Sequence, residues 1–447
     1  MLTVIAMGVA GLVRLVYSAV VGRSFGPTVL GSVNELIAVA TFCTLFVSPG
    51  LGQAISKEIS YCASEPDDQK KEALLWYGEK LHTSLLLLCS VAAFFYCIFS
   101  NSFLISFLVF GVTLTYGIYS YRKAILYGVQ KVQLYAISEL LAGIFLIIST
   151  LVFSFSGFPS LLTLPFVLGY GLFAVFSYRA RVHRAYYPIG KQKKRLAYFA
   201  FFTAIGTASS TGLLYLAMAV GAATLNSRSA GIVSAALTLT TPLFLIPRAV
   251  SVVIFPAMAR AIGTDNISAV ANQFRLSFKV LCSAGTVAII GMTLLAPEIM
   301  RLVYGPRFGG LELEFALLLV GTWAGIISVP AVNYLSVKQG FAYTIPTFAS
   351  LLGLVVALCI WLGWQSPLAL CGGYCVAKLI QGGIPMCLVE LSSLNDRLGL
   401  TLLLTCTTCV CASIVVLQNT SLPMRMFAIA VGMTMTALVL RYGKGSR

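Results

Sequence analysis

Residues 135–156 read YAISELLAGIFLIISTLVFSFS, and this stretch decides the class of fold. It contains one charged side chain, Glu139. As an α-helix rising 1.5 Å per residue it is about 33 Å long, which matches the roughly 30 Å hydrocarbon core of a bilayer. Lipid offers no partner to backbone N–H and C=O groups, so they must be bonded within the chain. The stretch therefore predicts a membrane-spanning helix.

Similar apolar runs recur along the whole chain. Of its 447 residues, 59% are hydrophobic and 10% are charged, and its mean hydropathy is +0.93. A soluble domain carries about 25% charged residues, so this composition excludes a soluble globular protein. We expect an all-α polytopic membrane protein with about 14 transmembrane helices. The runs predict spans at residues 2–22, 30–53, 81–99, 103–121, 135–156, 160–178, 197–221, 230–255, 277–300, 313–336, 342–362, 367–389, 398–417 and 422–440.

The basic residues predict the orientation of these spans. If the N-terminus is cytoplasmic, the cytoplasmic loops and the tail carry 22 Lys and Arg residues, and the opposite face carries five. Loops rich in Lys and Arg stay on the cytoplasmic side, so we expect a multi-pass protein of the cytoplasmic membrane with both termini inside. The five on the opposite face are Arg23, Arg228, Arg301, Arg307 and Arg425.

The net charge of +16 then needs no nucleic-acid partner, and none is expected. The basic run at 179–195 is interpreted as an anchor on anionic lipid headgroups. A first span that begins at Met1 is unusually abrupt, so the true N-terminus is expected to lie upstream of this chain.

An internal repeat predicts the domain organisation. Gly11-Leu12-Val13 aligns with Gly212-Leu213-Leu214, and Gly31-Ser32-Val33 aligns with Gly231-Ile232-Val233. The offsets of about 200 residues predict two parallel six-helix bundles that enclose a V-shaped cleft, an architecture typical of transporters. We expect bundles at 1–180 and 197–390, a basic cytoplasmic linker at 181–196, and two additional helices with a cytoplasmic tail at 391–447.

Two prolines and five buried charges are candidates for the transport machinery. Pro49 and Pro247 fall at matching points of the second and eighth spans and predict gating kinks, with a simple packing kink as the alternative. A charge in mid-membrane costs at least about 2.5–3.5 kcal/mol, so each should face a wet cavity or a partner. The basic members are Arg14, Arg248 and Lys378, and the acidic members are Glu35 and Glu139.

The excess of buried positive charge favours an anionic ligand, with a diphosphate as the obvious choice because Arg and Lys bind phosphate oxygens well. The alternative is that Arg14 or Lys378 pairs with Glu139 or Glu35 between helices, or extends to the membrane surface. Tyrosines at 116, 119, 121, 127 and 135 surround a predicted cytoplasmic boundary and are interpreted as an interfacial aromatic belt rather than a substrate site.

Other chemistry finds no support in the sequence. There is no phosphate-binding G-x-x-x-x-G-K-[ST] loop, and the two histidines, His82 and His183, lie apart in predicted cytoplasmic regions. Cys406, Cys409 and Cys411 lie in an apolar helix without a second set of ligands, so they are interpreted as small apolar residues. We expect no catalytic residue, metal or cofactor, and no enzyme.

Several short motifs resemble the polysaccharide flippases of the multidrug/oligosaccharidyl-lipid/polysaccharide (MOP) exporter superfamily. The motifs are Val21-Gly22-Arg23-Ser24-Phe25-Gly26-Pro27, Gly50-Leu51-Gly52 with Ala54-Ile55-Ser56-Lys57, residues 297–305, Tyr334-Leu335 and Gln339-Gly340. The resemblance implies a V-shaped pair of six-helix bundles that carries polyprenyl-diphosphate-linked sugars to the outer leaflet. In the lipid II flippase branch, cavity arginines on helices 1, 2 and 8 are held to grip the diphosphate. Arg14 and Arg248 lie on corresponding helices, whereas helix 2 has no mid-helix arginine.

The leading hypothesis is therefore a flippase for a polyprenyl-diphosphate-linked oligosaccharide in cell-surface polysaccharide biosynthesis. Arg14, Arg248 and Lys378 would bind the diphosphate, and envelope-polysaccharide assembly proteins are candidate partners. One alternative is a proton- or sodium-coupled antiporter of small molecules or drugs, with Glu35 or Glu139 as the coupling carboxylate. Another is a membrane glycosyltransferase or ligase, for which the candidate outer acids are Glu298, Glu312 and Glu314.

Overall fold

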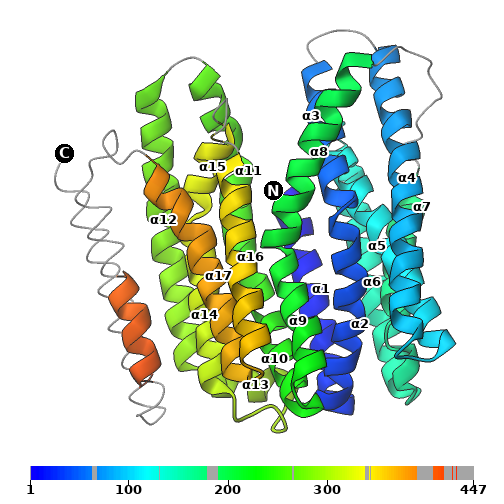
Figure 1. The fold of residues 1–447 in the computed structure, drawn as a ribbon, viewed down its shortest axis with the longest axis vertical. Coiled ribbons are helices and arrows are strands. Elements are labelled where there is room, and N and C mark those ends of the chain that lie inside the picture. Colours follow the sequence, from blue (N-terminus) through cyan, green and yellow to red (C-terminus); the bar gives the residue numbers. More distant parts are fainter. Residues whose placement is uncertain are drawn as a thin grey trace. The chain divides into compact units, whose positions relative to one another are not determined.

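The computed structural model describes residues 2–62, 68–129, 131–178, 190–263, 266–337, 342, 344–389 and 406–416, together with Arg425 and Ile429. The regular structure of this part of the chain is helical (Figure 1). Each predicted span from 2–22 to 398–417 contains helix, which confirms the all-α polytopic class; the last, 422–440, lies almost wholly outside the described residues. Within the described residues, nine helices are long and apolar enough to cross a membrane, and a bent pair makes a tenth.

The chain packs as two compact units, Met1–Ser234 and Ala235–Arg447. The first contains α1 (Leu2–Phe25), α2 (Pro27–Leu45), α3 (Ser48–Cys62), α4 (Asp68–Ile98), α5 (Phe103–Gly128), α6 (Val132–Phe155), η1 (Pro159–Leu161), α7 (Leu164–Ser177), α8 (Gly190–Ser210), α9 (Gly212–Thr224) and the start of α10 (Ser227–Thr240). The second contains η2 (Thr241–Phe244), α11 (Leu245–Gly263), α12 (Ile267–Leu294), α13 (Ala296–Tyr304), α14 (Glu312–Ile327), α15 (Val329–Val337), α16 (Ile345–Gly363), α17 (Pro367–Leu388) and a helix at Cys406–Val416. The predicted bundle limits and the linker at 181–196 stay a prediction.

The first unit is held together by close helix contacts at glycines. α1 packs against α6, and α6 packs against α7. A Cβ atom added to Gly143 would lie 2.9 Å from Val13 of α1, and one added to Gly169 would lie 2.9 Å from Leu146 of α6. Helices in lipid gain stability when small residues let their backbones approach. The apolar sequence therefore makes the helices, and these glycines set how closely α1, α6 and α7 pack.

The second predicted span is broken where Pro49 lies. α2 ends at Leu45 and α3 begins at Ser48, so Pro49 occupies the first turn of α3, where a missing N–H removes no helical hydrogen bond. Ser48 Oγ lies 3.0 Å from His82 Nε2 of α4, and the His82 ring stacks on Tyr121 with the centroids 4.0 Å apart. His82 is 2% exposed, and its ring packs at the break between α2 and α3.

The seventh predicted span is broken beside the second. α8 and α9 meet at Thr211 with a bend of 48°. A Cβ atom on Gly212, the first residue of α9, would lie 2.9 Å from Phe42 and 3.2 Å from Leu45 at the end of α2. The two breaks are therefore in contact, and a bend at one is coupled by packing to the other.

The helix pattern repeats along the chain with the offset predicted from the sequence. α1 ends at Phe25 and α2 begins at Pro27; about 200 residues later α9 ends at Thr224 and α10 begins at Ser227. The span that starts with α10 is also broken, at η2, and Pro247 is the third residue of α11. Both prolines therefore lie just after a break in their span. Their role as gating bends stays a prediction.

The second unit is built around α17. This helix packs against α16 and α14, and α12 packs against α14 and α11. Gly353 lets α16 approach α17 so closely that an added Cβ atom would lie 2.6 Å from the Ala377 carbonyl oxygen. Trp361 is 1% exposed, and its Nε1 donates a hydrogen bond to the Leu370 carbonyl at 2.9 Å, which closes the turn between α16 and α17.

Two ion pairs agree with the predicted grouping of loops by side. Glu79 and Arg122 adjoin loops expected on one side of the membrane, and their carboxylate and guanidinium groups are paired. Glu298 and Arg425 are expected on the opposite side and also pair, at 3.6 Å. The side that faces the cytoplasm stays a prediction.

Candidate functional site

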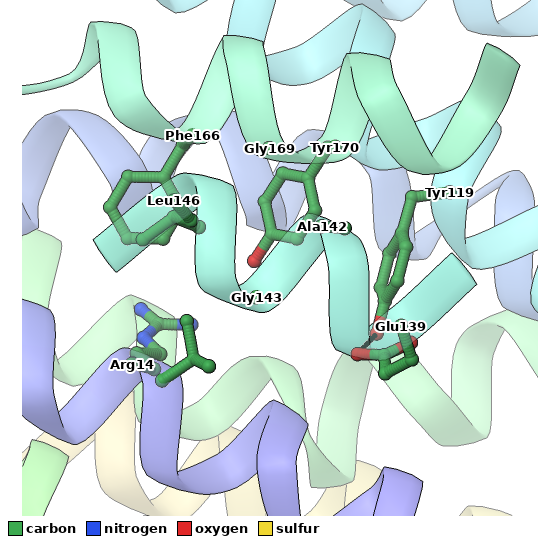
Figure 2. Close-up of a pocket in the computed structure, with 10 residues that line it drawn as sticks. Arg14, Tyr119, Glu139, Ala142, Gly143, Leu146, Phe166, Gly169 and Tyr170 are labelled. Atoms are coloured by element: carbon green, nitrogen blue, oxygen red, sulfur yellow. Dashed lines mark hydrogen bonds between the residues drawn. The ribbon is translucent and has the colours of Figure 1, made fainter. Parts of the chain in front are cut away.

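The first unit contains a small cavity among α1, α5, α6 and α7, with a mainly apolar lining and two charged side chains. Arg14 of α1 and Glu139 of α6 lie at opposite ends of it, with the ring of Tyr170 from α7 between them (Figure 2). Its volume is about 30 Å³, whereas roughly 10–15 Å³ is enough for one water molecule. The cavity can therefore hold about two waters, but no diphosphate. The other lining residues are Val13, Tyr119, Ala142, Gly143, Leu146, Phe166 and Gly169.

Arg14 makes one side-chain hydrogen bond in this arrangement. Its Nη1 donates to Tyr215 Oη of α9 at 3.0 Å, and its Cζ lies 5.0 Å from the centroid of the Tyr215 ring. Its Nη2 is buried without a hydrogen-bond partner. An unsatisfied buried donor on a charged group is costly. The guanidinium therefore gains stability when Nη2 donates to a further acceptor.

Glu139 is bonded on the other side of the cavity. It is 6% exposed, and its Oε1 accepts a hydrogen bond from Tyr119 Oη at 2.9 Å. Tyr119 Oη in turn accepts from Lys123 Nζ at 3.2 Å. Lys123 thus reaches the carboxylate through one tyrosine hydroxyl, and this chain supplies positive charge and a donor to the buried acid.

Arg14 is not paired with a carboxylate in the described part of the chain. Glu139 lines the same cavity, but its Oε1 accepts a hydrogen bond from Tyr119, and Arg14 bonds to a neutral phenol. The alternative in which Arg14 and Glu139 join two helices as a direct ion pair is therefore not what the structure forms. The arrangement leaves a guanidinium that can bind an anion.

Three of the five tyrosines assigned to an interfacial belt are buried in the protein, so the prediction is wrong for those three. Tyr119, Tyr121 and Tyr135 are 7%, 3% and 0% exposed. A belt residue would place its ring in the lipid headgroup region. Here Tyr116, Tyr119 and Tyr170 pack on one another with ring centroids 4.8–5.7 Å apart. The rings bury apolar surface and direct their hydroxyl groups toward the charged side chains.

The second unit contains a separate buried cation, Lys378 of α17. The residue is 7% exposed, and its Nζ donates to Gln381 Oε1 at 2.9 Å. Gln381 Nε2 donates onward to Ser350 Oγ of α16 at 2.8 Å. The rings of Phe244 and Tyr374 lie 5.8 and 5.7 Å from the ammonium nitrogen, within the range of cation–π attraction. Lys378 is thus held inside the unit by an amide and two ring faces.

The remaining predicted site residues are more open. Arg248 of α11 is exposed, and Glu35 of α2 is half-buried. Arg14 belongs to the first unit, and Arg248 and Lys378 to the second. Their convergence on one diphosphate stays a prediction, as do the coupling roles of Glu35 and Glu139.

Tyr215 is a site residue that was not predicted from the sequence. The internal repeat contained the signal, because the offset of 201 that aligns Gly11 with Gly212 also aligns Arg14 with Tyr215. The two positions that the repeat makes equivalent therefore bond to one another.

The Tyr119–Glu139 bond can be measured by a double-mutant cycle. We expect Tyr119→Phe to lower the free energy of unfolding by about 1–3 kcal/mol, because it removes a hydrogen-bond donor from a buried carboxylate. In a Glu139→Met background the same change should cost much less. Equilibrium unfolding in mixed detergent micelles measures both, and costs that add within about 0.5 kcal/mol would contradict the bond.

Comparison with known families gives one sequence match. The sequence model of the polysaccharide biosynthesis protein family matches residues 1–262. This range includes all of the first unit and with it Arg14, Glu139 and Tyr215. No curated protein sequence matches the chain.

Solved structures share the fold over nearly the whole chain. The lipid II flippase MurJ, in an inward closed conformation, is similar with a TM-score of 0.70 and 14% identity over 99% of each chain. A multidrug resistance MATE transporter of the MOP superfamily, in an inward-facing conformation, has a TM-score of 0.59 and 14% identity over 92% of this chain and 96% of its own. A eukaryotic MATE transporter has a TM-score of 0.61 and 14% identity over 90% and 96%. At these identities the likeness shows the fold, which is that of polytopic transporters.

Proposed function

Because this chain belongs to the polysaccharide biosynthesis protein family and has the fold of MOP superfamily transporters, we propose that it flips a polyprenyl-diphosphate-linked oligosaccharide across the cytoplasmic membrane. The family and the fold are those of transporters and flippases. Alternating access would carry the saccharide headgroup through the protein while the polyprenyl tail stays in lipid. The product would serve cell-surface polysaccharide biosynthesis, with envelope-assembly proteins as partners.

The observation that carries this proposal is the guanidinium of Arg14. It lines a small cavity, one of its terminal nitrogens has no hydrogen-bond partner among the described protein atoms, and the other bonds to a neutral phenol. A membrane protein that keeps such a charge in a span incurs an insertion cost of at least about 2.5–3.5 kcal/mol. Binding an anion is the use that accounts for this cost, because Arg forms paired, charge-assisted bonds to phosphate oxygens.

The substrate enters from the cytoplasm in this proposal, with both termini on that side. The basic residues at the cytoplasmic loops bind anionic lipids and bring diphosphate headgroups near the entrance. Arg248 and Lys378, which belong to the second unit, would provide further positive charge for the diphosphate. The inside-negative membrane potential also favours outward movement of an anion, by about 2.3 kcal/mol per charge per 100 mV.

Reconstitution tests the proposal. Proteoliposomes that contain the full chain and a fluorescent polyprenyl-diphosphate disaccharide should move the lipid to the outer leaflet, where an added glycosidase or quencher reports it. Liposomes without protein give the background rate. A matched neutral polyprenol-linked disaccharide should move far more slowly. Equal rates for the two lipids would contradict diphosphate recognition, and no movement of either would contradict the proposed function.

A second candidate function is an ion-coupled antiporter of small molecules. The observation in its favour is Glu139, a carboxylate buried within a span that lines a small cavity, together with the MATE-like fold. In that case efflux of a cationic dye from proteoliposomes should require a proton or sodium gradient and should stop in Glu139→Gln. Dye efflux that is absent under every gradient would exclude this candidate.

A further inference from the structure

Arg14 and Tyr215 occupy equivalent positions of the internal repeat, and their contact locates them relative to the axis that relates the two repeats. The distance between residues related by a two-fold axis is twice their distance from that axis. Two residues at equivalent positions of the repeats can therefore touch only close to the axis. Arg14 touches Tyr215, and a Cβ atom on Gly31 would lie 2.9 Å from Cα of Gly231, its own repeat mate. Both contacts lie within the first unit. The axis that relates α1 and α2 to α9 and α10 thus passes beside the Arg14 guanidinium.

The bond to Tyr215 occupies one end of the guanidinium. Tyr215 is 7% exposed, and Tyr116 of α5 also shares a hydrogen bond with its hydroxyl, which holds that hydroxyl toward Arg14. The cavity on the other side of Arg14 has room for about two waters. Nη1 carries two N–H donors and Tyr215 Oη takes one of them, so an anionic headgroup can use every terminal donor of Arg14 only if Tyr215 moves away.

The helix that carries Tyr215 begins at a bend, which is a place where its direction can change. α9 begins directly after the 48° bend at Thr211, and Tyr215 lies within its first turn. The bend packs on the end of α2 through Gly212, next to the break between α2 and α3. A change in the bend angle would carry the phenol away from Arg14 without unfolding either helix.

We propose that Tyr215 competes with the substrate for Arg14. In the substrate-free state the Tyr215 hydroxyl oxygen binds the Arg14 guanidinium, and the anionic group of the substrate replaces it as α9 swings at Thr211. The proposal rests on the function proposed above. A phenol is a neutral acceptor, and a phosphate oxygen forms a stronger, charge-assisted bond to the same guanidinium. Replacing the phenol therefore gains binding free energy for an anionic headgroup and none for a neutral lipid. The Arg14–Tyr215 pair would therefore make release of α9 conditional on the charge of the headgroup.

Binding of farnesyl diphosphate to the full chain in lipid nanodiscs tests the competition. Tyr215→Phe keeps the ring and removes the competing oxygen, so we expect it to bind this soluble diphosphate about three- to tenfold more tightly than the unaltered protein. Tyr116→Phe should change affinity in the same direction by less. The matched control is Tyr17→Phe on α1, because Tyr17 is also buried but its hydroxyl bonds to the Leu162 carbonyl. It should leave affinity unchanged.

The Arg14→Met background separates the two proposals. If Tyr215→Phe binds more tightly only where Arg14 is present, the competition is supported. If Tyr215→Phe binds equally or more weakly while Arg14→Met loses binding, the competition is wrong and the proposed function stands. If Arg14→Met binds farnesyl diphosphate as well as the unaltered protein, Arg14 is not the diphosphate ligand, and both proposals fail.

Discussion

Arg14→Met is expected to lower flipping of a polyprenyl-diphosphate saccharide by at least about tenfold and, in the same protein, to raise the temperature of unfolding. The first effect follows from loss of charge-assisted bonds to phosphate oxygens, each worth about 1.5–3 kcal/mol. The second follows because methionine removes a charge whose Nη2 has no partner and which costs at least about 2.5 kcal/mol to hold in a span. The flipping assay in proteoliposomes and thermal unfolding in detergent measure the two effects separately.

Arg122 is the matched control for this variant. It is 4% exposed, pairs with Glu79, and lies 4.1 Å from the centroid of the Tyr178 ring. Arg122→Met leaves the Glu79 carboxylate without its partner, so we expect a lower temperature of unfolding. An Arg14→Met protein that is less stable but flips normally would make Arg14 a structural residue like Arg122, contrary to this account.

Gly231→Ala is expected to destabilise the protein by about 3 kcal/mol or more, enough to reduce the yield of folded protein sharply. A Cβ atom at this position of α10 would lie 1.9 Å from the carbonyl oxygen of Pro27 and 2.5 Å from its carbonyl carbon. These are backbone atoms at the start of α2, so no side-chain rotation relieves the clash. The yield of monodisperse protein in size-exclusion chromatography and its temperature of unfolding measure the effect.

Gly291→Ala is the matched control. Gly291 lies inside α12, and an added Cβ atom would meet nothing within 4 Å. Alanine favours the helix over glycine by up to about 1 kcal/mol, so this variant should be as stable as the unaltered protein or more so. If the two alanine variants were equally stable, α2 and α10 would not approach as closely as the structure shows.

The spans could be predicted from the sequence because lipid leaves the backbone little choice. A run such as 135–156 must be helical if it crosses the membrane, and the structure has a helix at Val132–Phe155. The breaks could be located only in part. Pro49 and Pro247 mark two of them, but the bend at Thr211 contains no proline and arises where α9 packs against the end of α2. That contact is tertiary, and hydropathy does not report it.

The charged residues of the site could be predicted from the sequence because charged side chains are rare within membrane spans. Arg14, Lys378 and Glu139 were identified by that rule alone, and the structure gives each of them polar partners inside its own unit. The rule says nothing about neutral partners, so Tyr215 was missed. The tyrosines of α5 were assigned to the membrane interface because they lie near a predicted boundary. Their helix packs against α3, α4 and α7, and this depends on tertiary contacts that the sequence pattern does not contain.

The most direct test of the central claim, that Arg14 binds the diphosphate, is a structure of the full chain in nanodiscs with a polyprenyl-diphosphate disaccharide. We predict density for the diphosphate in contact with the Arg14 guanidinium, with Tyr215 Oη moved from its present 3.0 Å to beyond hydrogen-bond distance. The polyprenyl tail should extend into the lipid. A diphosphate bound elsewhere, with the Arg14–Tyr215 bond intact, would contradict the account.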